Sequence, residues 1–383
     1  MTNNKFRVYF ISTIFIVIIS FPLINSRFSL IKDIPSNENR KMASKPQLNF
    51  NLLDPYPPLY EKYYSDNFTI RSLMIKYYNL LNIYAFEKSP IPDQVIFGKD
   101  GWLFLAGNEL DAYRGKNSFN QKDLEEFKLE LEYRKKYIEN NGGKFYFMIA
   151  PNKANIYSNK MPNNIFKINN QSWGEQLIEY LNLNSNVKPI DISNALINTK
   201  KENLYYKLDN HWTELGAFYA SNEVLKRIHL DFPKVNQLPI SDYDLLISDK
   251  THQGNIANML SNLKSFKEFE YKLVRKPNFK AVDAAKAGYK VTEGFPYSWD
   301  YENVKEIIGS KNPKILIISD SFGYSIFPFI SEEFSRSVKI FDAWQYKLNE
   351  EIIQKEKPDI VLLITVEPLL KNILKYQSRL NIK

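Results

Sequence analysis

The chain has 383 residues and a formal net charge of +8, with 44% hydrophobic and 25% charged residues. These proportions are those of a folded globular protein with enough apolar residues for a core, and they exclude an intrinsically disordered chain. The absence of cysteine excludes a disulfide framework, a thiolate metal site and a catalytic thiol. The basic residues are scattered, without a dense basic block, so we expect a basic surface and no nucleic-acid partner.

An uncharged apolar run occupies Val8 to Ile24 and follows Lys5 and Arg7. A helix of this length, rising ~1.5 Å per residue, just spans the hydrocarbon core of a bilayer. Because the next residues, Asn25 to Phe28, contain no small-x-small cleavage site, we expect an uncleaved signal anchor over residues 1–30, with a cleaved signal peptide as the alternative. The rest of the chain is then expected outside the cytoplasm, anchored to the membrane. A buried soluble helix is disfavoured because terminal apolar segments with a basic flank rarely pack inside a domain.

Residues 31–92 are expected to form a stalk followed by a helical region. The stretch Ile31 to Leu53 is polar and contains Pro35 and Pro46, which suits an extended stalk. From Leu59 to Phe86 apolar residues recur at helical spacing.

Residues 93–383 are expected to form one α/β domain, because short apolar runs alternate there with periodic helical stretches. This alternation predicts a mostly parallel sheet covered by helices on both faces. In such sheets ligands bind beyond the carboxyl ends of the strands. The predicted helices are Gln121–Asn140, Trp173–Leu183 and Glu214–Ile228, and the predicted strands are Lys144–Ala150, Val187–Ile192, Lys314–Ser319, Ser337–Asp342 and Asp359–Val366.

Ser321 is the candidate nucleophile. It follows the strand that begins at Lys314 and precedes a predicted helix. A serine at such a sharp turn has an exposed hydroxyl, and the backbone N–H groups of the helix N-terminus can receive a developing oxyanion. The alternative is that Ser321 or Asp320 only caps the helix.

A serine hydroxyl needs a base, usually a histidine oriented by a carboxylate. Asp209 and His211 lie two positions apart in a predicted loop, just before Thr213, the expected cap of the next helix. In an extended loop their side chains can point the same way, so Asp209 would orient His211. A surface or core histidine at a helix start is the alternative. Of the 3 histidines, His229 is expected to be structural, and His252, in a polar loop, is the reserve candidate for the base.

Several sequence blocks occur in the order in which a known family carries them. They are Asn37–Arg40 with Pro46, Asp66–Arg71, Phe97–Phe104, Ala150–Lys153 with Ile156–Tyr157 and Met161–Pro162, Asp209–Thr213 with Gly216, and Ser319–Phe322. Together they resemble the alginate O-acetyltransferase AlgX/AlgJ family. The resemblance implies an SGNH-hydrolase-like, three-layer α/β domain with a mostly parallel sheet.

Two positions depart from the family pattern. Ser319 stands where a glycine usually precedes Asp-Ser, which loosens the oxyanion argument because a glycine N–H approaches a ligand more easily. Gly254–Ile256 stands where a Gly-Asp-Leu segment is expected. No role is therefore carried over to Asn255.

The resemblance also implies a mechanism in which Ser321, activated by His211 and Asp209, accepts an acetyl group and passes it to a hydroxyl of a cell-envelope or secreted polysaccharide. The Ser321 N–H, together with Asn152 or Lys153 from a strand-end loop, would hold the oxyanion. No metal or bound cofactor is implied. Because acetyl-CoA is cytoplasmic, the expected acetyl supplier is a membrane-bound O-acyltransferase.

Two other functions fit the same residues. Water competes with a sugar hydroxyl for an acyl-enzyme, so the chain is alternatively a carbohydrate acetylesterase. The third interpretation is a non-catalytic polysaccharide-binding envelope protein. The complete Asp-His-Ser set disfavours this interpretation.

Overall fold

A computed structural model of the protein describes residues 2–34, 42–51, 53–199, 203–252, 254–260, 267–276, 278–291 and 300–381. Pro35 and the Asn37–Arg40 block lie outside the described residues. The chain divides into two units, residues 1–92 with 257–264, and residues 93–256 with 265–383.

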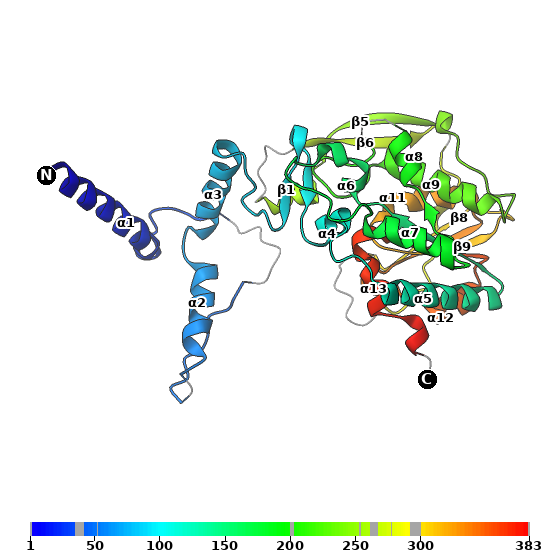
Figure 1. The fold of residues 1–383 in the computed structure, drawn as a ribbon, viewed down its shortest axis with the longest axis horizontal. Helices are drawn as coiled ribbons and strands as arrows, with labels where there is room; N and C mark the ends of the chain where they lie inside the picture. The colour runs from blue at the N-terminus through cyan, green and yellow to red at the C-terminus, as the bar shows by residue number, and fades with distance from the viewer. Residues whose placement is uncertain are drawn as a thin grey trace. The chain divides into compact units, whose positions relative to one another are not determined.

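The described part of residues 2–92 forms the helices α1 (Thr2–Phe28), α2 (Tyr56–Asn67) and α3 (Arg71–Ala85) (Figure 1). Within α1, the segment Lys5–Phe28 has a mean hydropathy of 2.2 and is long and apolar enough to cross a membrane. The amphipathic stretch expected from Leu59 to Phe86 forms two helices rather than a continuous one. The break is local, because Phe68 is extended and Ile70 takes a left-handed φ of 65°.

The second unit is built on a seven-stranded sheet in the order β4-β3-β11-β9-β10-β8-β7. The five strands from β4 to β10 are parallel, whereas β8 and β7 add an antiparallel edge. The predicted strand Val187–Ile192 is only two residues long, since it lies at the sheet edge and pairs with β3 alone. The strands are β3 (Lys144–Ala150), β4 (Ile190–Asp191), β7 (Val282–Asp283), β8 (Glu302–Glu306), β9 (Lys314–Ser319), β10 (Arg336–Phe341) and β11 (Ile360–Val366).

Helices cover both faces of this sheet (Figure 1). In β9, Ile317 joins the apolar cluster under α9 (Glu214–His229) and α11 (Phe322–Ile330), while Leu316 joins the cluster under α5 (Gln121–Asn140) and α7 (Trp173–Asn184). Successive strand residues point to opposite faces, so a continuous apolar run is buried on both sides. The expected three-layer α/β fold with a mostly parallel sheet is therefore confirmed.

Shorter elements complete the second unit. Two antiparallel pairs lie outside the main sheet, β1 (Val95–Phe97) with β2 (Leu103–Leu105), and β5 (Tyr243–His252) with β6 (Glu268–Arg275). The sequence patterns did not predict these pairs. The remaining α-helices are α4 (Asn108–Arg114), α6 (Lys153–Ile156), α8 (Ser193–Asn198), α10 (Asn255–Met259, of which residues 257–259 belong to the first unit), α12 (Glu350–Glu356) and α13 (Leu370–Lys375), and the short 3-10 helices are Lys99–Gly101, Ser158–Lys160, Ile240–Asp242, Ser331–Glu333, Glu367–Leu369 and Ser378–Asn381.

The turn from β9 into α11 is packed tightly. The Ser319 side chain is fully buried, and its hydroxyl has no hydrogen-bond partner among the described residues. It lies directly under Gly323, where an added Cβ would come within 1.9 Å of Ser319 Oγ. Glycine at 323 thus makes room for the serine that departs from the family pattern.

We predict that Gly323→Ala lowers the free energy of unfolding by about 1–3 kcal/mol, the usual cost of overpacking a core. The double variant Ser319→Gly/Gly323→Ala should recover much of this loss, because it removes the atoms that the new methyl group meets. Denaturant titration of the wild type, both single variants and the double variant gives the coupling free energy. A coupling near zero would contradict the steric account.

Candidate active site

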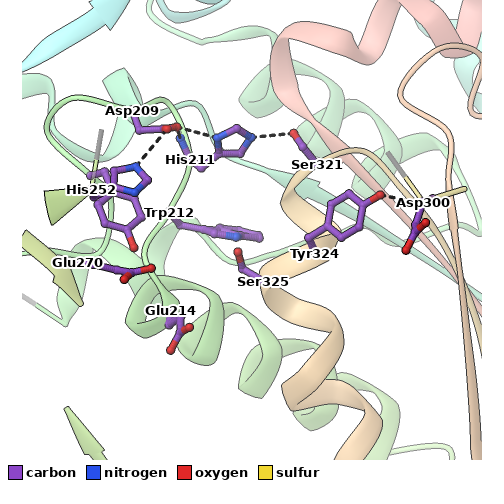
Figure 2. Close-up of a pocket in the computed structure, with 11 residues that line it drawn as sticks. Asp209, His211, Trp212, Glu214, His252, Glu270, Asp300, Ser321, Tyr324 and Ser325 are labelled. Carbon is purple, nitrogen blue, oxygen red and sulfur yellow. Dashed lines mark hydrogen bonds and ion pairs between the residues drawn. The ribbon is translucent and has the colours of Figure 1, made fainter. Parts of the chain in front are cut away.

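The side chains of Asp209, His211 and Ser321 meet at the carboxyl end of β9 (Figure 2). Ser321 immediately precedes α11, in the turn after β9. Asp209 and His211 lie in the loop before α9. The two arms of this loop are joined by backbone hydrogen bonds from Tyr206 N to His211 O and from Thr213 N to Leu204 O. This pairing folds the loop back on itself. Both side chains are thereby held at its tip.

The three side chains form a continuous hydrogen-bonded chain. His211 Nε2 lies 2.7 Å from Ser321 Oγ, and His211 Nδ1 lies 2.6 Å from Asp209 Oδ1. Because a carboxylate can only accept, Nδ1 carries the proton and Nε2 accepts from the serine hydroxyl. This is the tautomer that a general base acting on Ser321 requires.

Ser321 does not serve as a side-chain helix cap. It occupies the N-cap position of α11, yet its side chain makes no capping hydrogen bond. The neighbouring Asp320 accepts from Phe322 N (2.8 Å), Tyr346 Oη (2.8 Å) and Val366 N (2.6 Å) instead. Asp320 therefore fixes the turn to the adjacent strand β11, which leaves the Ser321 hydroxyl for the imidazole.

Asp209 is buried, and its second oxygen has two further partners. Oδ2 accepts from Asn255 N at 2.9 Å and lies 3.2 Å from His252 Nε2. The His252 ring stacks on Tyr206, with centroids 3.9 Å apart and an interplanar angle of 14°. His252, the reserve candidate for the base, thus lies behind Asp209 and not beside Ser321 (Figure 2).

Gly254 explains how Asn255 reaches Asp209. A Cβ added at Gly254 would lie 2.0 Å from Leu208 O, so only glycine permits this approach of two backbone segments. Asn255 contacts Asp209 through its backbone N–H, a group that every residue except proline has. The departure from the family pattern at Asn255 is therefore compatible with this bond.

Lys153 and Asn152 do not lie in the pocket beside Ser321, in contrast to the expectation from the sequence. The Lys153 ammonium donates to the carbonyls of Tyr206 (3.2 Å), Lys207 (3.2 Å) and Asp209 (2.7 Å), which occupy all three of its N–H bonds. Asn152 caps α6 through Ala154 N and donates to Glu109 O at 2.6 Å. Lys153 is buried, and its hydrogen bonds hold the backbone of the loop that carries Asp209. The spacing of residues in the sequence does not indicate this role.

Glu268 holds the same loop through its amides. Its carboxylate accepts from Lys207 N at 2.8 Å and from Leu208 N at 3.1 Å. Lys153 donates to the carbonyls of this loop, and Glu268 accepts from its N–H groups. Both kinds of backbone group before Asp209 are therefore held by side chains. The sequence pattern does not indicate this role of Glu268, because its position depends on the β5–β6 pair.

The surroundings favour a charged Asp209 beside a basic His211. Burial alone would lower the pKa of His211, but the hydrogen bond and charge of Asp209, with the charges of Asp320 and Glu109, outweigh it and raise that pKa. Burial would likewise raise the pKa of Asp209, but hydrogen bonds from His211 and His252 hold it far below its usual range. Asp209 therefore stays ionised and stabilises the imidazolium that proton transfer creates.

A pocket of about 560 Å³ opens at Ser321 and His211, a size that suits a small-molecule ligand or a few sugar units. Within the described ranges, no group of three or more His, Cys, Asp or Glu residues could hold a metal ion. Tyr324 Oη donates to Asp300 O at 2.8 Å and so ties one wall together. The aromatic lining residues are Tyr206, Trp212 and Tyr324, and the acidic ones besides Asp209 are Glu214, Glu270 and Asp300.

Residues 95–291 match the family described as SGNH hydrolase-like domain, acetyltransferase AlgX. The matched range includes Asp209 and His211 and ends before Ser321. No curated protein sequence matches the chain.

Two solved structures of one protein share the fold. PatB1 of Bacillus cereus has a TM-score of 0.57 at 20% identity, covering 74% of this chain and 99% of that chain. A second PatB1 structure, with a sulfonyl adduct, gives 0.55 at 19% identity over the same shares of 74% and 99%. The O-acetyltransferase domain of Pseudomonas putida AlgJ gives 0.49 at 14% identity, covering 73% of this chain and 92% of that chain.

We predict that His211 titrates above the usual histidine value of about 6.5 and that Asp209→Asn lowers its pKa. Removing the carboxylate charge removes the main stabilisation of the imidazolium. With 3 histidines in the chain, NMR of labelled histidine rings can follow each one, assigned by single substitutions. An unchanged or higher pKa in the variant would show that Asp209 does not control the ring.

We further predict that His252→Phe slows covalent labelling of Ser321 by a fluorophosphonate probe about tenfold. Phenylalanine keeps the stacking on Tyr206 but cannot donate to Asp209, and a hydrogen bond to a charged group contributes about 1.5–3 kcal/mol. His252→Gln, which retains a donor, is the matched control and should react faster than His252→Phe. Wild-type labelling rates in both variants would remove His252 from the site.

Proposed function

We propose that this chain, which belongs to the family of the SGNH hydrolase-like acetyltransferase AlgX, transfers acetyl groups to hydroxyls of a cell-envelope or secreted polysaccharide through an acyl-enzyme on Ser321. The observation that supports the proposal is the pair of hydrogen bonds that joins Asp209 to His211 and His211 to Ser321 Oγ. Family membership supports acetyl transfer in general. The serine-linked mechanism rests on the geometry of these three side chains.

In the first half-reaction, Ser321 Oγ attacks the acetyl carbonyl of the donor while its proton moves to His211 Nε2. The tetrahedral intermediate carries its negative charge on the former carbonyl oxygen. We assign the Ser321 backbone N–H, at the N-terminus of α11, as one donor to this oxygen. When the intermediate collapses, the donor's leaving group departs with the proton from His211, and the acetyl ester of Ser321 remains.

In the second half-reaction, a sugar hydroxyl enters the pocket and loses its proton to His211 Nε2 as its oxygen attacks the acetyl ester. Collapse of the second intermediate releases the acetylated sugar, and Ser321 Oγ regains the proton. The ring of Tyr324, which lines the pocket and is partly exposed, suits this acceptor, because flat rings pack against the apolar faces of sugars. Water would give hydrolysis by the same steps.

The proposed location rests on α1. We propose that its apolar segment Lys5–Phe28 anchors the chain and that the catalytic unit lies outside the cytoplasm. Acetyl-CoA does not occur there, so the acetyl group must be delivered across the membrane. A membrane-bound O-acyltransferase is the proposed supplier.

An assay with an activated acetyl ester, with and without oligosaccharide, distinguishes an acetyltransferase from an acetylesterase and from a non-catalytic polysaccharide-binding protein. Acetyl transfer that depends on sugar supports the proposal, whereas rapid release of acetate in water alone identifies an esterase. Equal inertness of the wild type and Ser321→Ala would identify a binding protein.

In this assay Ser321→Ala should lower turnover by at least about a thousandfold, the scale of losing a triad nucleophile. Ser325→Ala is the matched control, because Ser325 lies one turn further along α11 and lines the same pocket. It should retain most of the activity. Comparable losses in the two variants would indicate damage to the pocket and not loss of a nucleophile.

A further inference from the structure

One face of α3 is an exposed apolar stripe. Its members are Met74, Tyr77, Tyr78, Leu81 and Tyr84, with exposed fractions of 43%, 63%, 58%, 53% and 59%. At ~100° per residue they cover about 120° of the helix circumference, as in an amphipathic helix. Soluble monomers rarely leave such a continuous stripe open to water.

The stripe is distinct from the buried side of α3. Asn79 and Ile83 are the buried residues of the helix. No acidic residue occurs in α3, whose basic residues are Arg71 and Lys76. A helix with exposed Tyr, Leu and Met, basic residues and no acid has the composition of a segment that lies at a membrane surface.

The start of α3 is tied to the end of α1. Thr69 Oγ1 donates to Pro22 O at 2.8 Å, and Asp33 Oδ1 accepts from Leu73 N at 3.0 Å. The chain from Phe28, where α1 ends, to Asp33 reaches at most roughly 17 Å even when fully extended. The first turn of α3 therefore stays close to the point where α1 would leave the bilayer.

We propose that α3 lies in the membrane–water interface beside α1, with its stripe from Met74 to Tyr84 against the lipid. This inference rests on the proposed membrane crossing of α1. Tyrosine suits the position because its ring sits at the acyl boundary while its hydroxyl reaches the headgroups. With α3 bound to lipid, residues 86–92, and not the whole of residues 29–92, would form the free tether of the catalytic unit.

The absence of cysteine from the chain makes a direct test possible. Single variants Leu81→Cys and Tyr77→Cys of the full-length protein carry an environment-sensitive fluorophore on the stripe. The labelled protein is reconstituted into phosphatidylcholine–phosphatidylglycerol vesicles, with and without nitroxide-labelled lipid as quencher. Ile16→Cys in α1 reports membrane insertion, Lys76→Cys reports the other side of α3, and Ile308→Cys reports an exposed site of the second unit, where Ile308 is 87% exposed.

Labels at 81 and 77 should be quenched several-fold more than the label at 308, and more than the label at 76. Quenching at 16 without quenching at 81 and 77 would overturn the inference and leave the anchor intact. No quenching at 16 would overturn both the membrane crossing of α1 and the interfacial position of α3. The proposed serine chemistry, which the acetyl-ester assay tests, would be unaffected. Disulfide-linked dimers of Leu81→Cys without lipid quenching would assign the stripe to a second copy of the chain, which also overturns the proposal.

Discussion

The site depends on the hydrogen bonds that surround the buried carboxylate of Asp209. One oxygen binds His211 Nδ1, and the other binds His252 and the Asn255 backbone N–H. A charge removed from water is tolerated only when such partners replace its hydration. The partners in turn gain a fixed orientation, and for His211 that orientation directs Nε2 to Ser321.

The fold supplies these partners from segments far apart in the chain. The loop that carries Asp209 is held by Lys153 after β3 and by Glu268 on β6. Ser321 comes from the end of β9, where Asp320 fixes the turn to β11. The parallel sheet brings these strand ends to one edge, and the β5–β6 pair closes the site from outside the sheet.

Sequence patterns predicted the elements whose signals are local. Helix α5 has its predicted bounds because a capping box of Asn120 and Asp123 marks its start, and β3 has them because a continuous apolar run marks a buried strand. The edge strand β4 and the β5–β6 pair depend on partners distant in sequence, so their extents could not be predicted. The same reason applies within the site. The proximity of Asp209 and His211 follows from their spacing, whereas the position of His252 behind Asp209 depends on β5–β6 and on a glycine at 254.

The central claim is that Ser321 carries the acetyl group between donor and acceptor. Its most direct measurement is rapid-quench peptide mass spectrometry after mixing the full-length protein with an acetyl donor and then adding oligosaccharide. The account predicts one acetyl group on the Ser321 peptide, formed before any acetylated sugar and lost faster with oligosaccharide than in buffer. Acetylated sugar formed at the wild-type rate with no acetyl on Ser321 at any time would contradict it.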